Sequence, residues 1–147
     1  MNIITHPNPI LRQKSLAINP EQILNSEFKK FVKDMGKIML KKDGAGLAAP
    51  QVGKNIRVII IETENGPQAY INPKILKKSW RKNVMEEGCL SIPGVFGKVK
   101  RSTTICLEYS DLETKKHKIK TSGLLARVFQ HEIDHLDGIL FIDKIQK

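Results

Sequence analysis

The sequence predicts a single α+β domain that spans residues 1–147. Two stretches, at 26–42 and 122–137, carry apolar residues at helical spacing, and short segments with strand composition lie between them. A chain of 147 residues is long enough for one domain with one core, and no repeat, linker or low-complexity segment divides it. We therefore expect antiparallel strands packed around the second helix, with the first helix toward the N-terminus.

The first helix is expected over residues 26–42, "SEFKKFVKDMGKIMLKK". Its apolar residues recur every three or four positions, which is typical of a helix with one buried face. Ser26 could cap the start of this helix and Gly44 could end it. The apolar positions are Phe28, Phe31, Val32, Met35, Ile38 and Met39.

Four segments have the features of strands. "RVIIIE" is a continuous apolar run, which indicates a buried strand, and "AYINP" is expected to stop at Pro73 because proline has no N–H to donate. "TTICLEY" alternates, with Ile105, Leu107 and Tyr109 on one face, and "KKHKIK" follows a polar turn. These four segments are residues 57–62, 69–73, 103–109 and 115–120.

The second helix, expected over 122–137, carries "QHEIDH", and Gly138 is expected to cap its C-terminus. His131 and His135 lie four residues apart, so a helix places their imidazoles on one face, one turn apart. The pair could bind one metal ion, with Glu132 beside an open coordination position. A catalytic metal usually has three protein ligands, so a third is expected elsewhere.

We expect the third ligand upstream, because the twelve residues after His135 contain no His, Cys or Glu, and Asp137 and Asp143 are their only acids. Cys106 lies in an alternating strand and could simply be packed, whereas His117 lies among lysines that disfavour a dication. Cys89 lies in "EEGCLSIPG", a segment whose glycines and proline predict an irregular, tightly turned chain. The candidates are therefore His6, Cys89, Cys106 and His117, with a free buried cysteine as the alternative for Cys89.

A third stretch, "GAGLAAPQVG" at 44–53, follows the first helix. Gly44 and Gly46 would let the backbone of another chain approach closely, and Gln51 offers an amide donor. A loop that merely ends the helix would explain the same residues.

Together the three stretches resemble peptide deformylases. Members of that family carry G-x-G-L-A-A-x-Q, E-G-C-L-S and Q-H-E-x-D-H in this order, and the chain has these motifs at 44–51, 87–91 and 130–135. Every fixed position matches and the opening "PNPILR" is similar too, so the resemblance covers essentially the whole chain. The resemblance implies that Cys89 is the third ligand.

The resemblance also implies the reaction: removal of the formyl group from N-formylmethionyl nascent peptides, with release of formate. It implies one divalent metal, with Fe²⁺ expected in the cell and Zn²⁺, Ni²⁺ or Co²⁺ able to replace it. Glu132 would transfer the proton, and the Gln51 amide and Leu90 N–H would donate to the developing oxyanion. Residues expected to bind the substrate backbone are Gly44, Gly46, Glu87 and Gly88.

The methionine side chain of the substrate needs an apolar pocket. Ile133, Phe129 and Val128 are candidates, although packing in the core would explain them equally well. Opposite charge suggests that Glu87 pairs with Arg101 and anchors its segment.

Three other interpretations fit parts of the sequence. A zinc endopeptidase would use the same histidines and glutamate, but it usually takes a further ligand downstream. A non-catalytic protein on the same scaffold could bind RNA or the ribosome, and a purely structural metal site would usually need a fourth protein ligand.

Charge and composition indicate the binding partners and the cellular compartment to expect. The net charge is +10, which favours weak association with polyanions, including the ribosome. A solvated lysine-rich surface would explain the same charge, and the sequence contains no nucleic-acid motif. Many bacterial deformylases use a helix beyond the segment matching "FIDKI" to dock on the ribosome, and this sequence ends at Lys147. Two cysteines, no secretory signal and no apolar run of membrane-spanning length predict a cytoplasmic protein, or an organellar one if a transit peptide has been removed.

Overall fold

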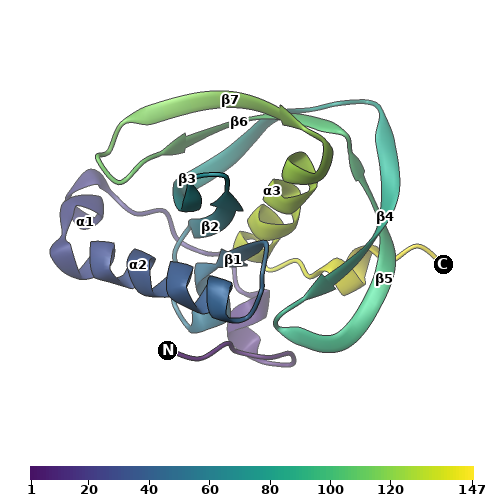
Figure 1. Cartoon of the computed structure of the whole chain (residues 1–147), viewed down its shortest axis with the longest axis horizontal. Coiled ribbons are helices and arrows are strands. Elements are labelled where there is room, and N and C mark those ends of the chain that lie inside the picture. Colours follow the sequence, from purple (N-terminus) through teal and green to yellow (C-terminus); the bar gives the residue numbers. More distant parts are fainter.

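Figure 1 shows the computed structural model, which describes all residues from Met1 to Lys147. A five-stranded antiparallel sheet has the order β1-β2-β3-β6-β7, and β4 and β5 form a separate two-stranded hairpin. The strands are β1 (Gly46–Ala48), β2 (Val58–Thr63), β3 (Gly66–Lys78), β4 (Lys82–Cys89), β5 (Ile92–Ser102), β6 (Thr104–Ser110) and β7 (Lys116–Ser122). The helices are α1 (Pro20–Leu24), α2 (Ser26–Lys41) and α3 (Gly123–Leu136), with 3₁₀ turns η1 (Pro9–Arg12), η2 (Ala49–Val52) and η3 (Phe141–Lys144).

Helix α3 lies at the centre of the molecule, between the larger sheet and the β4–β5 hairpin (Figure 1). Helix α2 covers the opposite face of β1, β2 and β3. Both faces of β2 are therefore covered, with Ile60 in the cluster under α2 and Ile59 and Ile61 in the cluster under α3. This double burial explains why "RVIIIE" is continuously apolar rather than alternating. The predicted α+β fold around a central helix is confirmed.

The first predicted helix is present, but its boundaries differ from those expected. Asn25, not Ser26, is the N-cap, and its side chain accepts a hydrogen bond of 2.8 Å from the N–H of Glu27. At the other end Asp43, not Gly44, adopts the left-handed conformation, with φ of 56°. Aspartate tolerates this region better than most residues, so it can end a helix as glycine does.

Strand β3 does not stop at Pro73 as predicted but continues to Lys78. The register with β6 shifts between Ile71 and Lys74, so Pro73 lies in a bulge that needs no ladder N–H from it. Asn72, with φ of 51°, fixes the bulge: its side chain accepts from the Ile18 N–H (3.0 Å) and donates to the Ile18 carbonyl (2.7 Å).

The region 86–94 is more regular than the predicted irregular segment. Glu87 and Cys89 belong to the end of β4, and the chain turns sharply at Leu90 and Ser91 into β5. The register shifts between Glu87 and Cys89, and this irregularity lets the hairpin end turn toward α3.

The predicted cap of α3 is confirmed. Gly138 has φ of 73°, its N–H bonds to the His135 carbonyl, and the Ile139 N–H bonds to the Asp134 carbonyl. This is the Schellman arrangement, and it fixes the end of the helix directly after His135. None of the helices is both long and apolar enough to cross a membrane.

Candidate metal centre

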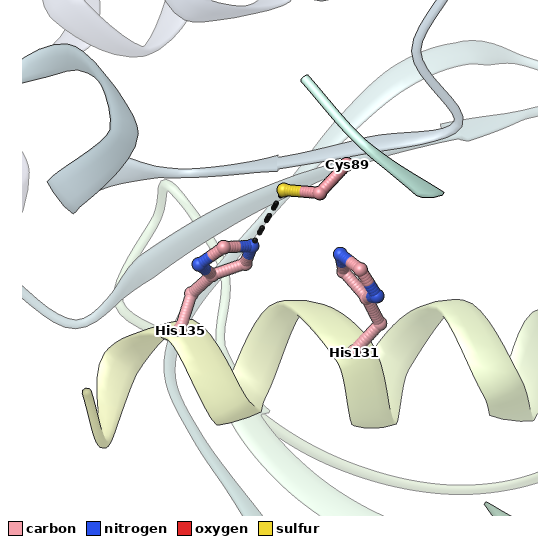
Figure 2. A group of neighbouring side chains, drawn as sticks. All are labelled: Cys89, His131 and His135. Carbon is pink, nitrogen blue, oxygen red and sulfur yellow. Dashed lines mark hydrogen bonds between the residues drawn. The ribbon is translucent and has the colours of Figure 1, made fainter. Parts of the chain in front are cut away.

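Cys89, His131 and His135 come together at the centre of the molecule, and one donor atom of each lies within 4.8 Å of the others. Figure 2 shows both imidazoles on one face of α3, with the Cys89 sulfur opposite them at the end of β4. The Cys89 Sγ lies 3.3 Å from His135 Nε2. The other sequence candidates are not part of this group: the ring of His117, for example, pairs with Asp111 at 2.7 Å.

The orientation of His131 is set by Glu87. The ring Nδ1 lies 2.9 Å from Glu87 Oε1, and a carboxylate can only accept, so Nδ1–H donates and Nε2 is left for a metal. Burial, followed by the charge of His131, holds the pKa of His135 well below its usual value. His135 is therefore neutral near pH 7, which is the form that binds metals.

These residues fit a divalent cation. One thiolate and two imidazoles suit a tetrahedral ion that keeps a fourth position open. Beside them, the buried Glu132 leaves its Oε1 with no hydrogen-bond partner in the protein. A buried carboxylate oxygen without a partner is costly, so its presence indicates that a bound water or substrate completes the site.

Glu87 is the junction of a buried charge network. Its carboxylate accepts from Arg101 Nε at 2.6 Å and Nη2 at 2.8 Å, from Arg127 Nη1 at 2.5 Å and from His131. The predicted pairing of Glu87 with Arg101 is thus confirmed. Burial acts to raise the pKa of Glu87, but the bonds from Arg101 and His131 outweigh it and hold that pKa far below its usual range. Burial likewise opposes a charged His131, but Glu132, Cys89 and Glu87 raise its pKa to about 10. A metal ion that binds here would therefore displace a proton from Nε2.

Sequence reasoning missed Arg127, which ties the hairpin to α3. Besides Glu87, its guanidinium donates to the Val99 carbonyl at 2.9 Å and to the backbone and side chain of Asn83 at 3.0 and 2.9 Å. Its position in the sequence could have identified it, because Arg127 lies four residues before His131 and a helix places both on one face. A buried arginine on the ligand face indicates a carboxylate partner nearby.

Gln51 was expected to offer an amide donor, and its orientation is fixed. Its Oε1 accepts from the Ala48 N–H at 2.9 Å. Its Nε2 donates to Ser91 Oγ at 3.1 Å and to Cys89 Sγ at 3.5 Å. The NH₂ group therefore faces the metal ligands. Sequence reasoning missed Ser91, a buried hydroxyl two residues after Cys89.

Glu132 lies directly against the backbone of Gly46. A Cβ at that position would be 2.7 Å from both Cγ and Oε2 of Glu132, closer than atoms can pack. Burial raises the pKa of Glu132 to about 7, whereas a nearby metal cation would favour the ionised form. Gly46 is thus needed to make room for the Glu132 carboxylate, more than to let the backbone of another chain approach.

We expect Gly46→Ala to lower kcat by at least about tenfold, because the new methyl group displaces Glu132 from the metal centre. Metal content should stay at the parent level, since the atoms nearest to the new methyl group all belong to Glu132, which is not a ligand residue. Gly36→Ala is the matched control. Gly36 lies in α2, away from the cleft, and its Cβ would be 3.2 Å from Pro67 in β3. Equal kcat values for Gly46→Ala and Gly36→Ala would contradict this role of Gly46.

A cleft of about 910 Å³ opens onto the centre. All four predicted substrate-binding residues line it, as do Gln51, Cys89, Leu90, His131 and Glu132. Of the three candidates for an apolar pocket, only Val128 lines the cleft. The prediction that Phe129 and Ile133 line the pocket was wrong. Both pack in the core between α3 and the larger sheet, because that face of the helix points away from the ligands. The substrate-binding candidates along the cleft are Gly44, Gly46, Glu87 and Gly88.

Comparisons with known proteins agree on one family. The family model described as polypeptide deformylase matches residues 1–147. A peptide deformylase of Rhizobium meliloti (strain 1021) is 41% identical over 150 residues, covering 99% of this chain and 84% of the relative. The crystal structure of peptide deformylase from Thermotoga maritima superposes with a TM-score of 0.94 at 39% identity, covering 99% of this chain and 97% of the other. A chloroplastic peptide deformylase 1B of Oryza sativa subsp. japonica is 39% identical over 99% of this chain and 55% of its own length.

Proposed function

Because the chain belongs to the polypeptide deformylase family, it is a metal-dependent enzyme that removes N-formyl groups, and we propose that Cys89, His131 and His135 hold its metal. The substrates are the formylated N-termini of nascent peptides. The observation that carries the proposal is the meeting of three donor atoms within 4.8 Å beside the buried Glu132.

A divalent metal at this centre, when bound, supplies a Lewis acid that lowers the pKa of water. Glu132 accepts the proton of the water that attacks the formyl carbon and delivers it to the leaving nitrogen. Its Oε1, which has no partner in the protein, is free for this proton. Gln51 Nε2 and the backbone N–H of Leu90 donate to the oxyanion that develops on the formyl oxygen. Glu87 keeps His131 in the required tautomer throughout.

The peptide backbone binds as an added strand. Strand β1 is the edge of the larger sheet and β4 belongs to a two-stranded hairpin, so both have an unpaired edge. Gly44 and Gly46, before and in β1, and Glu87 and Gly88, near the end of β4, all line the cleft. An extended peptide between them can form main-chain hydrogen bonds, while the apolar side chains of the cleft, Val128 among them, contact the methionine.

We expect Gln51→Ala to lower kcat by about 10²–10³-fold, because the site loses a donor already oriented toward the oxyanion. KM should change much less, since the donor acts mainly in the transition state. Ser91→Ala is the graded control, because it removes only the group that Gln51 Nε2 bonds to. Steady-state kinetics on a formylated tripeptide measures both. A rise in KM at constant kcat would assign Gln51 to substrate binding instead.

The metal in the cell is proposed to be Fe²⁺, although the Cys-His-His set also suits Zn²⁺, Ni²⁺ or Co²⁺. We expect protein purified without oxygen to contain about one iron per chain. We also expect its activity to fall in air, because dioxygen oxidises a ferrous–thiolate site, and to persist when Ni²⁺ replaces iron. Metal analysis paired with activity before and after air exposure tests this. A zinc-loaded protein with full, air-stable activity would contradict the assignment of iron.

The enzyme is proposed to act in the cytoplasm during protein synthesis, or in an organelle, as the chloroplastic relative does. Weak association with the ribosome would bring it to its substrates, and the net charge of +10 supports contact with RNA.

A further inference from the structure

A second hollow, of about 360 Å³, lies at the end of the β4–β5 hairpin that is remote from Cys89. It forms where β3 ends and β4 begins, and α3 and η3 each contribute a lining residue, Gln130 and Lys144. We name it the Trp80 hollow, after the only apolar residue in its lining. No aspartate or glutamate lines it, and its cationic residues are Lys78, Lys82, Lys100, Arg101 and Lys144.

Trp80 is the single tryptophan of the chain, and 98% of its surface is exposed. Tryptophan side chains are mostly buried, so an almost fully exposed one indicates a contact with something outside the molecule. Trp80 is not among the residues that line the active-site cleft, and the deformylation reaction does not use it.

The backbone on both sides of Trp80 is held firmly. The Ser79 carbonyl accepts from Ser102 Oγ at 3.0 Å, and the Ser79 N–H bonds to Thr104. The Arg81 carbonyl accepts from Thr103 N–H at 3.0 Å, from Thr103 Oγ1 at 3.2 Å and from Ser79 Oγ at 2.8 Å. The exposed indole is therefore carried on a fixed segment, so little backbone entropy is lost when it binds a partner.

The lysines of the hollow are placed for anions. Lys82 pairs with Ser102 across the hairpin and Val84 pairs with Lys100, so Lys82 and Lys100 are diagonal neighbours on one face. Neither they nor Lys78 form an ion pair with a carboxylate. Lys144 pairs with Asp134, and the buried Arg101 is engaged by Glu87 and Asp134. Three lysines without carboxylate partners thus line the same hollow as one exposed aromatic ring.

We propose that the Trp80 hollow binds single-stranded RNA, with one base stacked on the indole and neighbouring phosphates on Lys78, Lys82 and Lys100. An aromatic platform beside cations is the arrangement that binds unpaired strands, because every base has a π-face. An anionic membrane would need more apolar surface than one side chain provides. The inference extends the proposed association with the ribosome to a defined surface, and its test needs no catalytic activity.

Because Trp80 is the only tryptophan, its fluorescence reports on this hollow alone. The protein, loaded with metal, is titrated with oligo-uridylate of about twelve nucleotides at low salt. We expect saturable quenching of tryptophan emission, and log K falling with log salt at a slope of about −0.7 per phosphate neutralised. A duplex of the same length should quench little, because its bases are not free to stack.

Variants distinguish binding at the Trp80 hollow from nonspecific attraction to a basic protein. Anisotropy of labelled RNA should show about tenfold weaker binding for Trp80→Ala, with the salt slope kept. Lys82→Ala/Lys100→Ala should weaken binding and reduce the slope. Lys118→Ala/Lys120→Ala, on exposed β7, makes the same charge change elsewhere and should bind like the parent. Formate release should be unchanged in all three.

Three outcomes would overturn the proposal. One is the absence of quenching at low salt. Another is an equal loss of binding in the two double-lysine variants, which would indicate only nonspecific attraction to a basic protein. The third is quenching by vesicles rich in anionic lipid but not by RNA, which would assign the hollow to a membrane surface.

Discussion

Glu132→Ala is expected to lower kcat for deformylation by about 10²–10⁴-fold while the protein keeps its metal. Glu132 is buried beside the three ligand residues, and its Oε1 has no partner in the protein. The variant removes the only carboxylate placed to accept a proton from the attacking water. It removes no metal ligand, and the Glu87 network that orients His131 stays intact.

Glu132→Gln is the closer control, because it keeps the size and shape of the side chain but cannot accept the proton. Both variants should show parent-level metal content, because Glu132 is not one of the three ligand residues. Formate release in single-turnover and steady-state assays gives the loss in kcat. If Glu132→Gln retained parent activity, the proton would have to move by another route.

The second large effect is expected from Glu87→Ala, which should lower the free energy of unfolding by about 3–5 kcal/mol. Glu87 accepts hydrogen bonds from Arg101, Arg127 and His131, and all four groups are buried or nearly so. Removing the carboxylate leaves two buried guanidinium groups without their main counter-charge. Such truncation of a buried network is far more damaging than the loss of a surface pair.

The neighbouring residue provides a matched control. Glu86 is exposed, lies opposite Lys98 on the hairpin and has no buried partner, so Glu86→Ala should change stability by no more than about 0.5 kcal/mol. Urea unfolding of the metal-free proteins avoids any contribution from metal binding. Metal affinity should also fall about 10–100-fold in Glu87→Ala, because His131 loses the group that orients it. Similar unfolding midpoints for the two variants would contradict the network.

The ligand set could be predicted because its geometry is local. Two histidines four residues apart on a helix share a face whatever the rest of the fold does. The Schellman cap can be predicted in the same way, because it depends on a single glycine, Gly138. Cys89 was one of four donors on residue chemistry, and the resemblance to the family selected it. The structure brings Cys89, and none of the other three, to the two histidines.

What was missed depends on partners distant in sequence. The strand after Pro73 is held by a bulge that Asn72 fixes through Ile18, 54 residues away. The hairpin β4–β5 has exposed residues over most of β4, so it lacks the apolar alternation that marks a half-buried strand. Arg127 acquires its role through Glu87, Val99 and Asn83, which lie 28 to 44 residues away.

The face of α3 that carries Phe129 and Ile133 could not be assigned from the helix alone. Both residues neighbour metal ligands in the sequence, so either a pocket or a core explained them. The larger sheet packs on their side of α3, which places them in the core and leaves Val128 at the cleft. Only the position of the sheet decides between the two.

The most direct test is formate release from formyl-Met-Ala-Ser by iron-loaded protein prepared without oxygen, with acetyl-Met-Ala-Ser alongside. We expect rapid release of formate in step with new free amine, loss of activity on metal removal, and little or no cleavage of the acetylated peptide. A folded, metal-loaded protein that releases no formate would not be a deformylase, nor would one that instead cleaves bonds between the amino acids of either peptide.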